Sequence, residues 1–346
     1  MARIRPNIRN HFSLTRSLSP EVSRGKGGVA QTEAVPALLF VSLLAAFLLY
    51  MSRAGWLTVG HIPALIAFTT LLGVFLSLAV ERAVTFLRGL SASGLAKALW
   101  GSAALMFPGM LSLTLAPAGT TWRIALVPPY LVLPGFLLGR PRLPLRLTWE
   151  DAVALLLIWL PPDLGLLPGP LAKLLAVDWT LFLFLIVRRL DGVGYRYVLG
   201  VRSLIVAAAN AIVFGAIAVP LGLLSGFLSP ASAHASWIEL LFRAVGVYFA
   251  VAVPEEILFR GVILNLLQRG FPRRGPTVPL LLSAGLFGLA HWKERDWRYM
   301  LLAALAGIFY GGTYLRTGSV VCSGITHALV DFVWGLFFRT LWSPRG

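Results

Sequence analysis

The sequence is poor in charged residues and has a single cysteine, and each shortage excludes a class of protein. Charged residues make up 13% of the 346 residues, whereas hydrophobic residues make up 58%. A soluble domain of this length has no use for so much apolar surface, so the composition indicates a polytopic helical membrane protein. The one cysteine, Cys322, excludes a framework of intrachain disulfides and a cysteine-rich metal site.

Acidic residues are also scarce, since 14 Asp and Glu stand against 30 Lys and Arg, giving a formal net charge of +16. The basic residues lie between apolar segments and not in a soluble basic domain, which excludes binding to nucleic acid. Most of them fall on one side of the membrane if the N-terminus is cytoplasmic, as the positive-inside rule requires. We therefore expect an integral protein of the membrane, with compact basic loops typical of a bacterial inner (plasma) membrane protein.

Apolar segments bounded by charges or by Gly and Pro predict an all-α fold, a polytopic transmembrane helical bundle of about 8–11 spans. A basic tail over 1–35 lacks the apolar core of a signal peptide; an organellar presequence is the alternative, and Glu21 and Glu33 oppose it. An N-terminal transmembrane region over 36–200 and a catalytic transmembrane domain over 201–346 follow. The predicted spans are 36–56, 62–80, 98–116, 124–139, 149–161, 171–187, 204–224, 237–267, 277–292, 299–315 and 319–341.

Two adjacent glutamates, Glu255 and Glu256, lie in the middle of the apolar segment from Trp237 to Leu267. An ionisable side chain at bilayer depth costs at least a few kcal/mol, so it marks a functional site by default. Arg260 follows Glu256 by four residues, with the acid N-terminal to the base, which is the favourable order for an ion pair on a helix.

Two later apolar segments each place a histidine at depth, in Phe287-x3-His291 and in His327-x3-Asp331. A spacing of four puts both members of each pair on one helix face. At about 1.5 Å per residue, Glu255, His291 and His327 come to similar depths although the three spans alternate in direction. The sequence therefore predicts that they meet in one site, near the polar residues that follow His291.

Two hydrolytic mechanisms suit these groups. A carboxylate beside an imidazole can hold and deprotonate a water molecule, and a second histidine can donate to the oxyanion of a tetrahedral intermediate. Alternatively, the two histidines and the carboxylates of Glu255 and Asp331 could bind a zinc ion that keeps an open position for water. Both routes hydrolyse an amide.

The three motifs, Glu255-Glu256-x3-Arg260, Phe287-x3-His291 and His327-x3-Asp331, resemble in order and spacing those of the CPBP family. These are the CAAX prenyl endopeptidase and bacteriocin-processing-like intramembrane proteases, also called the ABI family. The flanking residues agree, with Phe-Arg-Gly after the glutamate pair, Leu-Phe-Gly-Leu-Ala before His291 and Tyr-Leu-Arg-Thr-Gly-Ser before the third motif. The resemblance extends from Ile238 to Thr340.

The resemblance implies a role for each matching residue. Glu255 and His291 activate the water, His327 and Asp331 form the oxyanion side, and Glu256 and Arg260 brace the first helix, while Phe287 packs. The third motif often ends in Asn, so Asp331 is a departure that leaves the metal question open. We expect a metal-independent, glutamate-type enzyme without a cofactor, with zinc held by His291, His327, Glu255 and Asp331 as the alternative.

The resemblance also implies the partners, which are the lipid bilayer and a peptide or protein substrate. That substrate is either a prenylated tail or a leader or sorting-signal peptide. Two other functions stay open: a proton-coupled transporter that relays protons through its buried acids and histidines, and a family member that acts as a scaffold or immunity factor without proteolysis. No inverted repeat, the usual mark of a transporter, is visible.

Two smaller predictions concern packing. Gly307, Gly311 and Gly312 recur on one segment and predict a close approach of two helices. Three aspartates fall near the predicted ends of spans, where a carboxylate costs little free energy: Asp151, Asp163 and Asp178.

Overall fold

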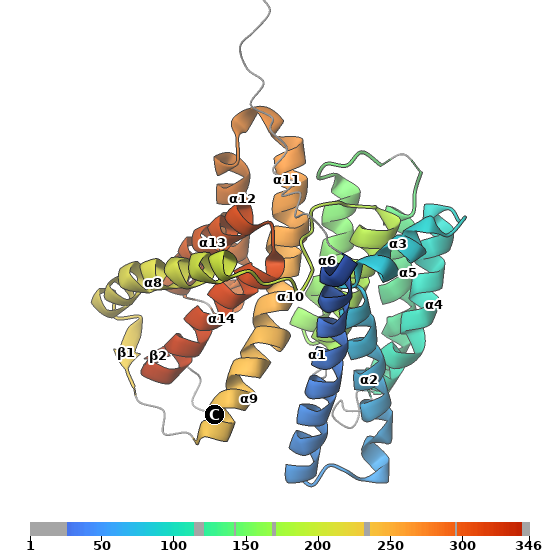
Figure 1. Cartoon of the computed structure of the whole chain (residues 1–346), viewed down its shortest axis with the longest axis horizontal. Helices are drawn as coiled ribbons and strands as arrows, with labels where there is room; N and C mark the ends of the chain where they lie inside the picture. Colours follow the sequence, from blue (N-terminus) through green and yellow to red (C-terminus); the bar gives the residue numbers. More distant parts are fainter. Residues whose placement is uncertain are drawn as a thin grey trace, which may run out of the picture.

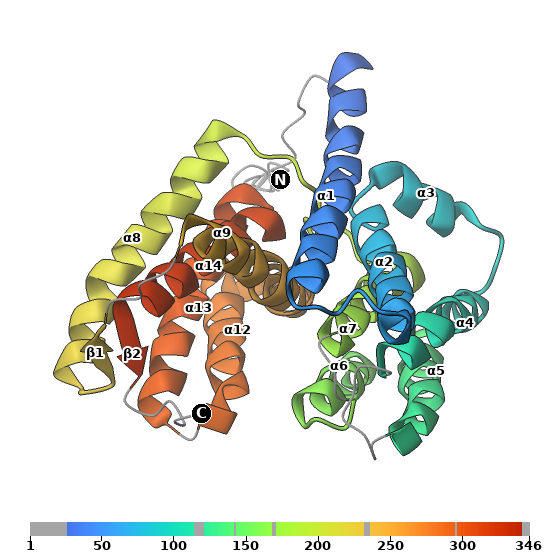
Figure 2. The ribbon, with the colours of Figure 1, turned by 90° about the horizontal axis from the view of Figure 1, so that it is seen from below.

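The chain folds into two groups of helices that lie side by side, α1–α7 in one and α8–α14 in the other (Figures 1 and 2). This computed structural model describes residues 26–113, 121–141, 143–167, 171–231, 236–294 and 296–340. Both views place the long helix that contains α10 at the border between the groups. The prediction of an all-α helical bundle is confirmed.

The N-terminal group consists of helices joined by short connections, and an extended segment over 188–200 leads from it to the second group. Three shorter helical segments accompany these helices: η1 (Val59–His61), η3 (Thr121–Leu126) and η4 (Phe182–Val187). The segment η4 is π-helical and continues the last helix of the group. The helices are α1 (Lys26–Arg53), α2 (Ile62–Ser77), α3 (Glu81–Gly89), α4 (Gly94–Ser112), α5 (Val127–Leu138), α6 (Trp149–Asp163) and α7 (Ala172–Leu181).

In the C-terminal group, one continuous helix runs from Trp237 to Gly270 and changes its winding along the way. It comprises α9 (Trp237–Gly246), the π-helical η5 (Val247–Ala252), α10 (Val253–Glu256), the π-helical η6 (Ile257–Leu264) and α11 (Asn265–Gly270). The other elements are α8 (Val201–Leu224), η7 (Pro272–Arg274), α12 (Thr277–Ala290), η8 (Trp292–Glu294), α13 (Trp297–Thr317) and α14 (Val320–Phe337), with a short antiparallel pair of β1 (Leu228–Pro230) and β2 (Phe338–Thr340).

Every predicted span coincides with a helix, whereas the short helix α3 was not predicted because it lacks a long apolar segment. Among the described residues, four helices are long and apolar enough to cross a membrane: Ala34–Arg53, Val59–Ser77, Val201–Leu224 and Val320–Phe337. The shorter apolar helices Trp122–Leu138 and Thr277–Ala290 add to them. The protein is therefore an integral membrane protein. The four helices that are both long and apolar enough are fewer than the 8–11 spans predicted from the sequence.

Two aspartates of the N-terminal group, Asp151 and Asp178, are fully buried. This burial corrects the prediction that they lie near span ends, where a carboxylate would cost little free energy. Asp151 caps α6 together with Thr148 and receives two hydrogen bonds from Arg188, at 2.9 and 3.0 Å. This bidentate pair ties the end of η4 to the start of α6. Neither carboxylate oxygen of Asp178 has a hydrogen-bond partner among the described residues. Asp163, in contrast, is exposed as expected.

The connection after α12 is held by Asp296, whose carboxylate accepts hydrogen bonds from the backbone and the side chain of Arg298 and so begins α13. The hydrogen bond from the Arg298 side chain, together with its charge, lowers the pKa of the Asp296 carboxyl. The loop that follows His291 is thus held in place at the end where α13 begins.

Helices α12 and α13 approach closely because glycines face the contact. A Cβ atom added to Gly307 would lie 2.9 Å from the Cα atom of Ala284, and one added to Gly311 would lie 2.3 Å from a side-chain carbon of Leu280. The predicted close approach is confirmed for these two glycines. Gly312 differs, because the nearest atom to its Cβ would be Nη1 of Arg316 on the same helix, at 3.2 Å.

We expect Gly307→Val to destabilise the protein far more than Gly312→Val. The first substitution forces apart two backbones, at a cost of about 1–3 kcal/mol or more, whereas the second meets the end of a flexible side chain. Thermal unfolding of the detergent-purified variants measures the difference. Equal melting temperatures for the two variants would contradict the packing described for α12 and α13.

Candidate active site

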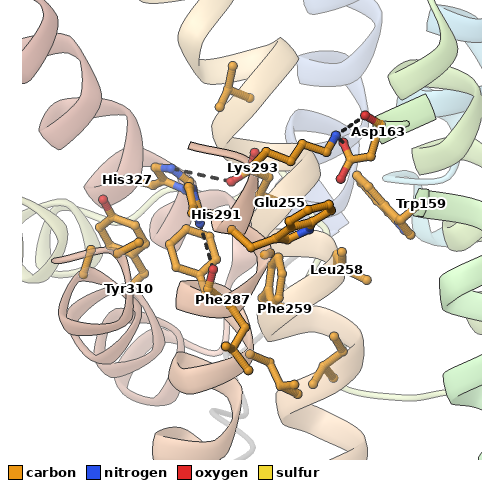
Figure 3. Close-up of a pocket in the computed structure, with 18 of the residues that line it drawn as sticks. Trp159, Asp163, Glu255, Leu258, Phe259, Phe287, His291, Lys293, Tyr310 and His327 are labelled. Carbon is orange, nitrogen blue, oxygen red and sulfur yellow. Dashed lines mark hydrogen bonds and ion pairs between the residues drawn. The ribbon is translucent and has the colours of Figure 1, made fainter. Parts of the chain in front are cut away.

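A cavity of about 890 Å³ lies where the two groups of helices meet. Leu155, Trp159 and Lys173 line it from α6 and α7 of the N-terminal group. The polar residues predicted from the sequence line it from the other side, and Figure 3 shows the labelled ones facing one another. They are Glu255 from α10, His291 from the end of α12, and His327 and Asp331 from α14.

Glu256 lies behind the cavity wall and is fully buried, and three hydrogen-bond donors reach its carboxylate. Oε1 accepts from Nη1 of Arg260 at 2.8 Å and from Nδ1 of His327 at 3.0 Å, and Oε2 accepts from Oγ of Ser323 at 2.5 Å. The Arg260 guanidinium is fully buried too, and it also donates to the carbonyl of Gly307 at 3.1 Å. The charge is thereby compensated, and Glu256 does not line the cavity.

Glu255, one residue earlier, points into the cavity and keeps its carboxylate free. Its side chain is 19% exposed, and among the described residues only two ion-pair contacts reach it, both at 4.0 Å. One is with Nζ of Lys173 and the other with Nε2 of His327. Neither distance is that of a hydrogen bond. The two neighbouring glutamates therefore have opposite environments, and only Glu255 can hold a water molecule.

His327 is held between carboxylates on both sides of its ring. Its Nδ1 contacts Glu256, and its Nε2 lies 3.3 Å from Oδ2 of Asp331. Since a carboxylate can only accept, both contacts are satisfied at once by an imidazolium that carries a proton on each nitrogen. The ring of Tyr310 stacks on it at 4.4 Å between centroids, with an angle of 17° between the planes. This packing fixes the orientation of the imidazole.

His291 ends α12 and is oriented by its own helix. Its Nδ1 lies 2.8 Å from the carbonyl oxygen of Phe287, and a carbonyl only accepts, so Nδ1 carries the proton. In the neutral ring, Nε2 then has a free lone pair. Tyr299 packs edge-on against the same ring at 5.0 Å between centroids. His291 is thus prepared to accept a proton at Nε2.

Phe287 packs, as expected, and it joins the parts of the site. Its ring contacts His291 at 4.8 Å and His327 at 5.7 Å between centroids. The Arg260 guanidinium lies over its face, 4.6 Å from the centroid, a favourable cation–π contact. The aromatic ring therefore contacts the buried charge of Arg260 and both histidines.

The glutamates occupy a single α-helical turn between two π-helical segments, η5 and η6. Short π-helical segments within α-helices are frequent at functional sites because they change which face a side chain occupies. Pro254, which has no N–H to donate, begins this turn, and a local change of winding relieves the lost hydrogen bond. The adjacent positions 255 and 256 thereby point into the cavity and into the protein, respectively.

One more ion pair crosses the cavity between the two groups of helices. Lys293, two residues after His291, lies 3.7 Å from Oδ1 of Asp163 at the end of α6 and also donates to that residue's carbonyl oxygen. Figure 3 shows its side chain extending over the cavity toward Asp163. The N-terminal group thus forms part of the site.

The structure brings together all the predicted site residues: Phe287 and the four polar residues named above line the cavity, and Glu256 and Arg260 lie behind its wall. Sequence reasoning missed Ser323, Tyr310 and Lys173. A serine or tyrosine in an apolar span is common and gives no signal by itself, but a lysine near the start of an apolar span is scarce enough to have been noticed. Cys322 is buried and does not line the cavity, so its thiol cannot act there as a nucleophile.

The donor set fits a metal ion poorly. Within the described ranges, no three side chains of His, Cys, Asp and Glu form a group that could hold one. His327 uses both ring nitrogens for carboxylates, and His291 has only Nε2 to offer. A zinc site would therefore need new positions for several of these side chains.

Residues 236–333 match the family model described as type II CAAX prenyl endopeptidase Rce1-like. The C-terminal region is thus similar to the type II CAAX prenyl endopeptidases. This finding confirms the family predicted from the three motifs, all of which lie within the match. It supports a membrane protease that acts on a peptide or protein. No curated protein and no solved structure matches the chain. The N-terminal residues that line the cavity lie outside the matched region.

We expect Arg260→Met to destabilise the protein strongly, because it leaves Glu256 as a buried charge without its cation. Breaking a buried pair in this way costs about 3–5 kcal/mol. The double variant Glu256→Gln with Arg260→Met should recover part of the loss, since no charge then stays buried. Thermal unfolding in detergent measures both. A single variant that melts with the wild type would show that the pair does not brace the site.

Proposed function

We propose that the protein is an intramembrane endopeptidase in which Glu255 and His291 activate a water molecule. The contrast between the two glutamates carries this proposal: Glu256 is buried and accepts three hydrogen bonds, whereas Glu255 faces the cavity with a carboxylate that accepts none among the described residues. The ion pair with Arg260 uses Glu256 alone. An acid with a free carboxylate that lines the same cavity as an imidazole with a free Nε2 is the arrangement that general-base catalysis requires.

In this mechanism a water molecule lies between Glu255 and Nε2 of His291. Its oxygen attacks the carbonyl carbon of the scissile bond, one proton passes to Glu255, and the carbonyl π electrons move to the oxygen. When the C–N bond breaks, the leaving nitrogen takes the proton from Glu255. His327 and Asp331 lie on the side of the carbonyl oxygen. His327 is held there by Glu256, which explains why the second glutamate is needed without touching the substrate.

The walls of the cavity favour a substrate that is attached to the membrane. Leu156 and Leu160 of α6, and Leu286 and Leu289 of α12, line the cavity and are also exposed on the protein surface. Two helices from different groups thus leave an apolar cleft through which a chain can enter from the lipid. The description of the matched family makes a prenylated C-terminal tail the first candidate, and a leader or sorting-signal peptide is the second.

We also propose that the protein lies in a bacterial inner membrane with a cytoplasmic N-terminus. With that orientation the predicted spans place Arg88 and Arg269 on the cytoplasmic side, and both donate to Asp191. On the other side, Lys293 meets Asp163. Residues assigned to one side of the membrane thus contact one another.

We expect Glu255→Gln and His291→Asn to abolish cleavage while the protein stays folded. Each change removes a proton acceptor at the cavity and no buried partner, so the melting temperature should change little. The assay is cleavage of a quenched peptide with a prenylated cysteine three residues before its C-terminus, in vesicles that contain the purified protein. A variant with wild-type activity, or an equal loss of folded protein in both, would overturn the assigned roles.

Exhaustive chelation should leave the activity unchanged, because the proposed base is a carboxylate and not a metal-bound water. Asp331→Asn should also keep an activity within about tenfold of the wild type, because the amide oxygen of the new side chain still accepts from His327. The loss of a general acid or base would lower the rate much more, typically about 10²–10⁴-fold. Asp331→Ala should lose more. Metal content is measured on the same samples. Activity lost on chelation and restored by one equivalent of zinc would reverse this assignment in favour of a metalloprotease.

A further inference from the structure

The proposed reaction creates an oxyanion, and the histidine donors in the part of the site matched by the family model already face acceptors. Nδ1 of His327 donates to Glu256, and its Nε2 faces Asp331 and Glu255, which are both acceptors. Nδ1 of His291 donates to the carbonyl oxygen of Phe287. The guanidinium of Arg260 is buried behind the wall. An oxyanion here must compete with carboxylates for any of these hydrogens.

Lys173 is the exception among the charged groups that line the cavity. Its ammonium is half-exposed, and its partner among the described residues is Glu255, at 4.0 Å from Nζ to Oε1. Among the residues that the structure describes, that distance leaves all three N–H groups without a hydrogen-bond acceptor. The other lysine at the cavity, Lys293, already donates to Asp163. Lys173 therefore brings free donors to within ion-pair distance of the proposed base.

The position of Lys173 is also unfavourable for its own helix. It is the second residue of α7, in the first turn, where no acidic residue lies and where the N-cap, Leu171, provides no side-chain hydrogen bond. The partial positive charge of a helix N-terminus repels a cation by about 0.3–1 kcal/mol. Positions that break a local rule are expected at functional or strained sites, and the charged partner of Lys173 is the proposed base itself.

We infer that Lys173, from the N-terminal region, is a catalytic residue that donates to the oxyanion of the tetrahedral intermediate. This inference rests on the proposed function. As the water oxygen bonds to the carbonyl carbon and its proton passes to Glu255, the electron pair of the C=O bond settles on the oxygen, next to the ammonium. Collapse returns that pair to the carbonyl as the C–N bond breaks. Lys173 keeps its proton throughout.

The experiment compares Lys173→Met with the wild type on the prenylated quenched peptide in vesicles. Removing one donor to an oxyanion lowers kcat about 10²–10³-fold, and KM should change little. A phosphinate analogue of the tetrahedral intermediate should lose affinity by the same factor as kcat/KM, whereas an uncleaved ground-state peptide should not. A drop confined to KM, or an unchanged affinity for the phosphinate, would overturn the inference.

Two further variants separate chemistry from structure. Lys173→Cys treated with bromoethylamine regains an ammonium at nearly the same reach, and the other thiol, Cys322, is buried; activity should return. Arg196→Met is the matched control, since Arg196 is also half-exposed and pairs with a carboxylate, Glu81, at 3.0 Å but does not line the cavity. It should leave kcat unchanged. Failure of the alkylated variant to regain activity would show that the ammonium is not what matters.

The outcomes also distinguish this inference from the proposed function. Absence of cleavage by the wild type, with no binding of the phosphinate, overturns the protease and the role of Lys173 together. Cleavage that is lost in Glu255→Gln but retained in Lys173→Met overturns only the role of Lys173.

Discussion

The carboxylate of Glu256 holds the site together, because three other polar members of the site donate hydrogen bonds to it. Arg260, Ser323 and His327 all donate to it, so it fixes the long helix and α14 relative to each other. Through Arg260 it also reaches the carbonyl of Gly307 on α13. A buried charge is tolerated only when its partners compensate it. The same requirement that stabilises the carboxylate therefore sets the position of the imidazole that faces the cavity.

Scarcity made the main site residues predictable. In a chain with 13% charged residues and five histidines, an acid or a histidine within an apolar span stands out, and helical spacing predicts which of them share a face. The same logic predicted the helices themselves. It could not decide which of the two glutamates faces the cavity, because that depends on the π-helical winding of η5 and η6, and no periodicity in the sequence encodes it.

The residues that were missed owe their roles to packing between distant segments. Ser323 and Tyr310 are ordinary residues of apolar helices, and only the folded structure places the first against Glu256 and the second against His327. Asp178 was misjudged for a similar reason, since distance from a predicted span end does not measure burial. The contribution of α6 and α7 to the cavity was invisible because neither helix carries a motif.

The proposed entry of the substrate between α6 and α12 has a consequence for how tightly that substrate must bind. A peptide that is anchored in the bilayer is confined to a thin layer around the protein, and this confinement raises its effective concentration at the entrance without any added contact. The exposed leucines of the two helices need only admit the chain and exclude water. Such a site can leave the ground state weakly bound and reserve its few polar contacts for the transition state, where they increase the rate.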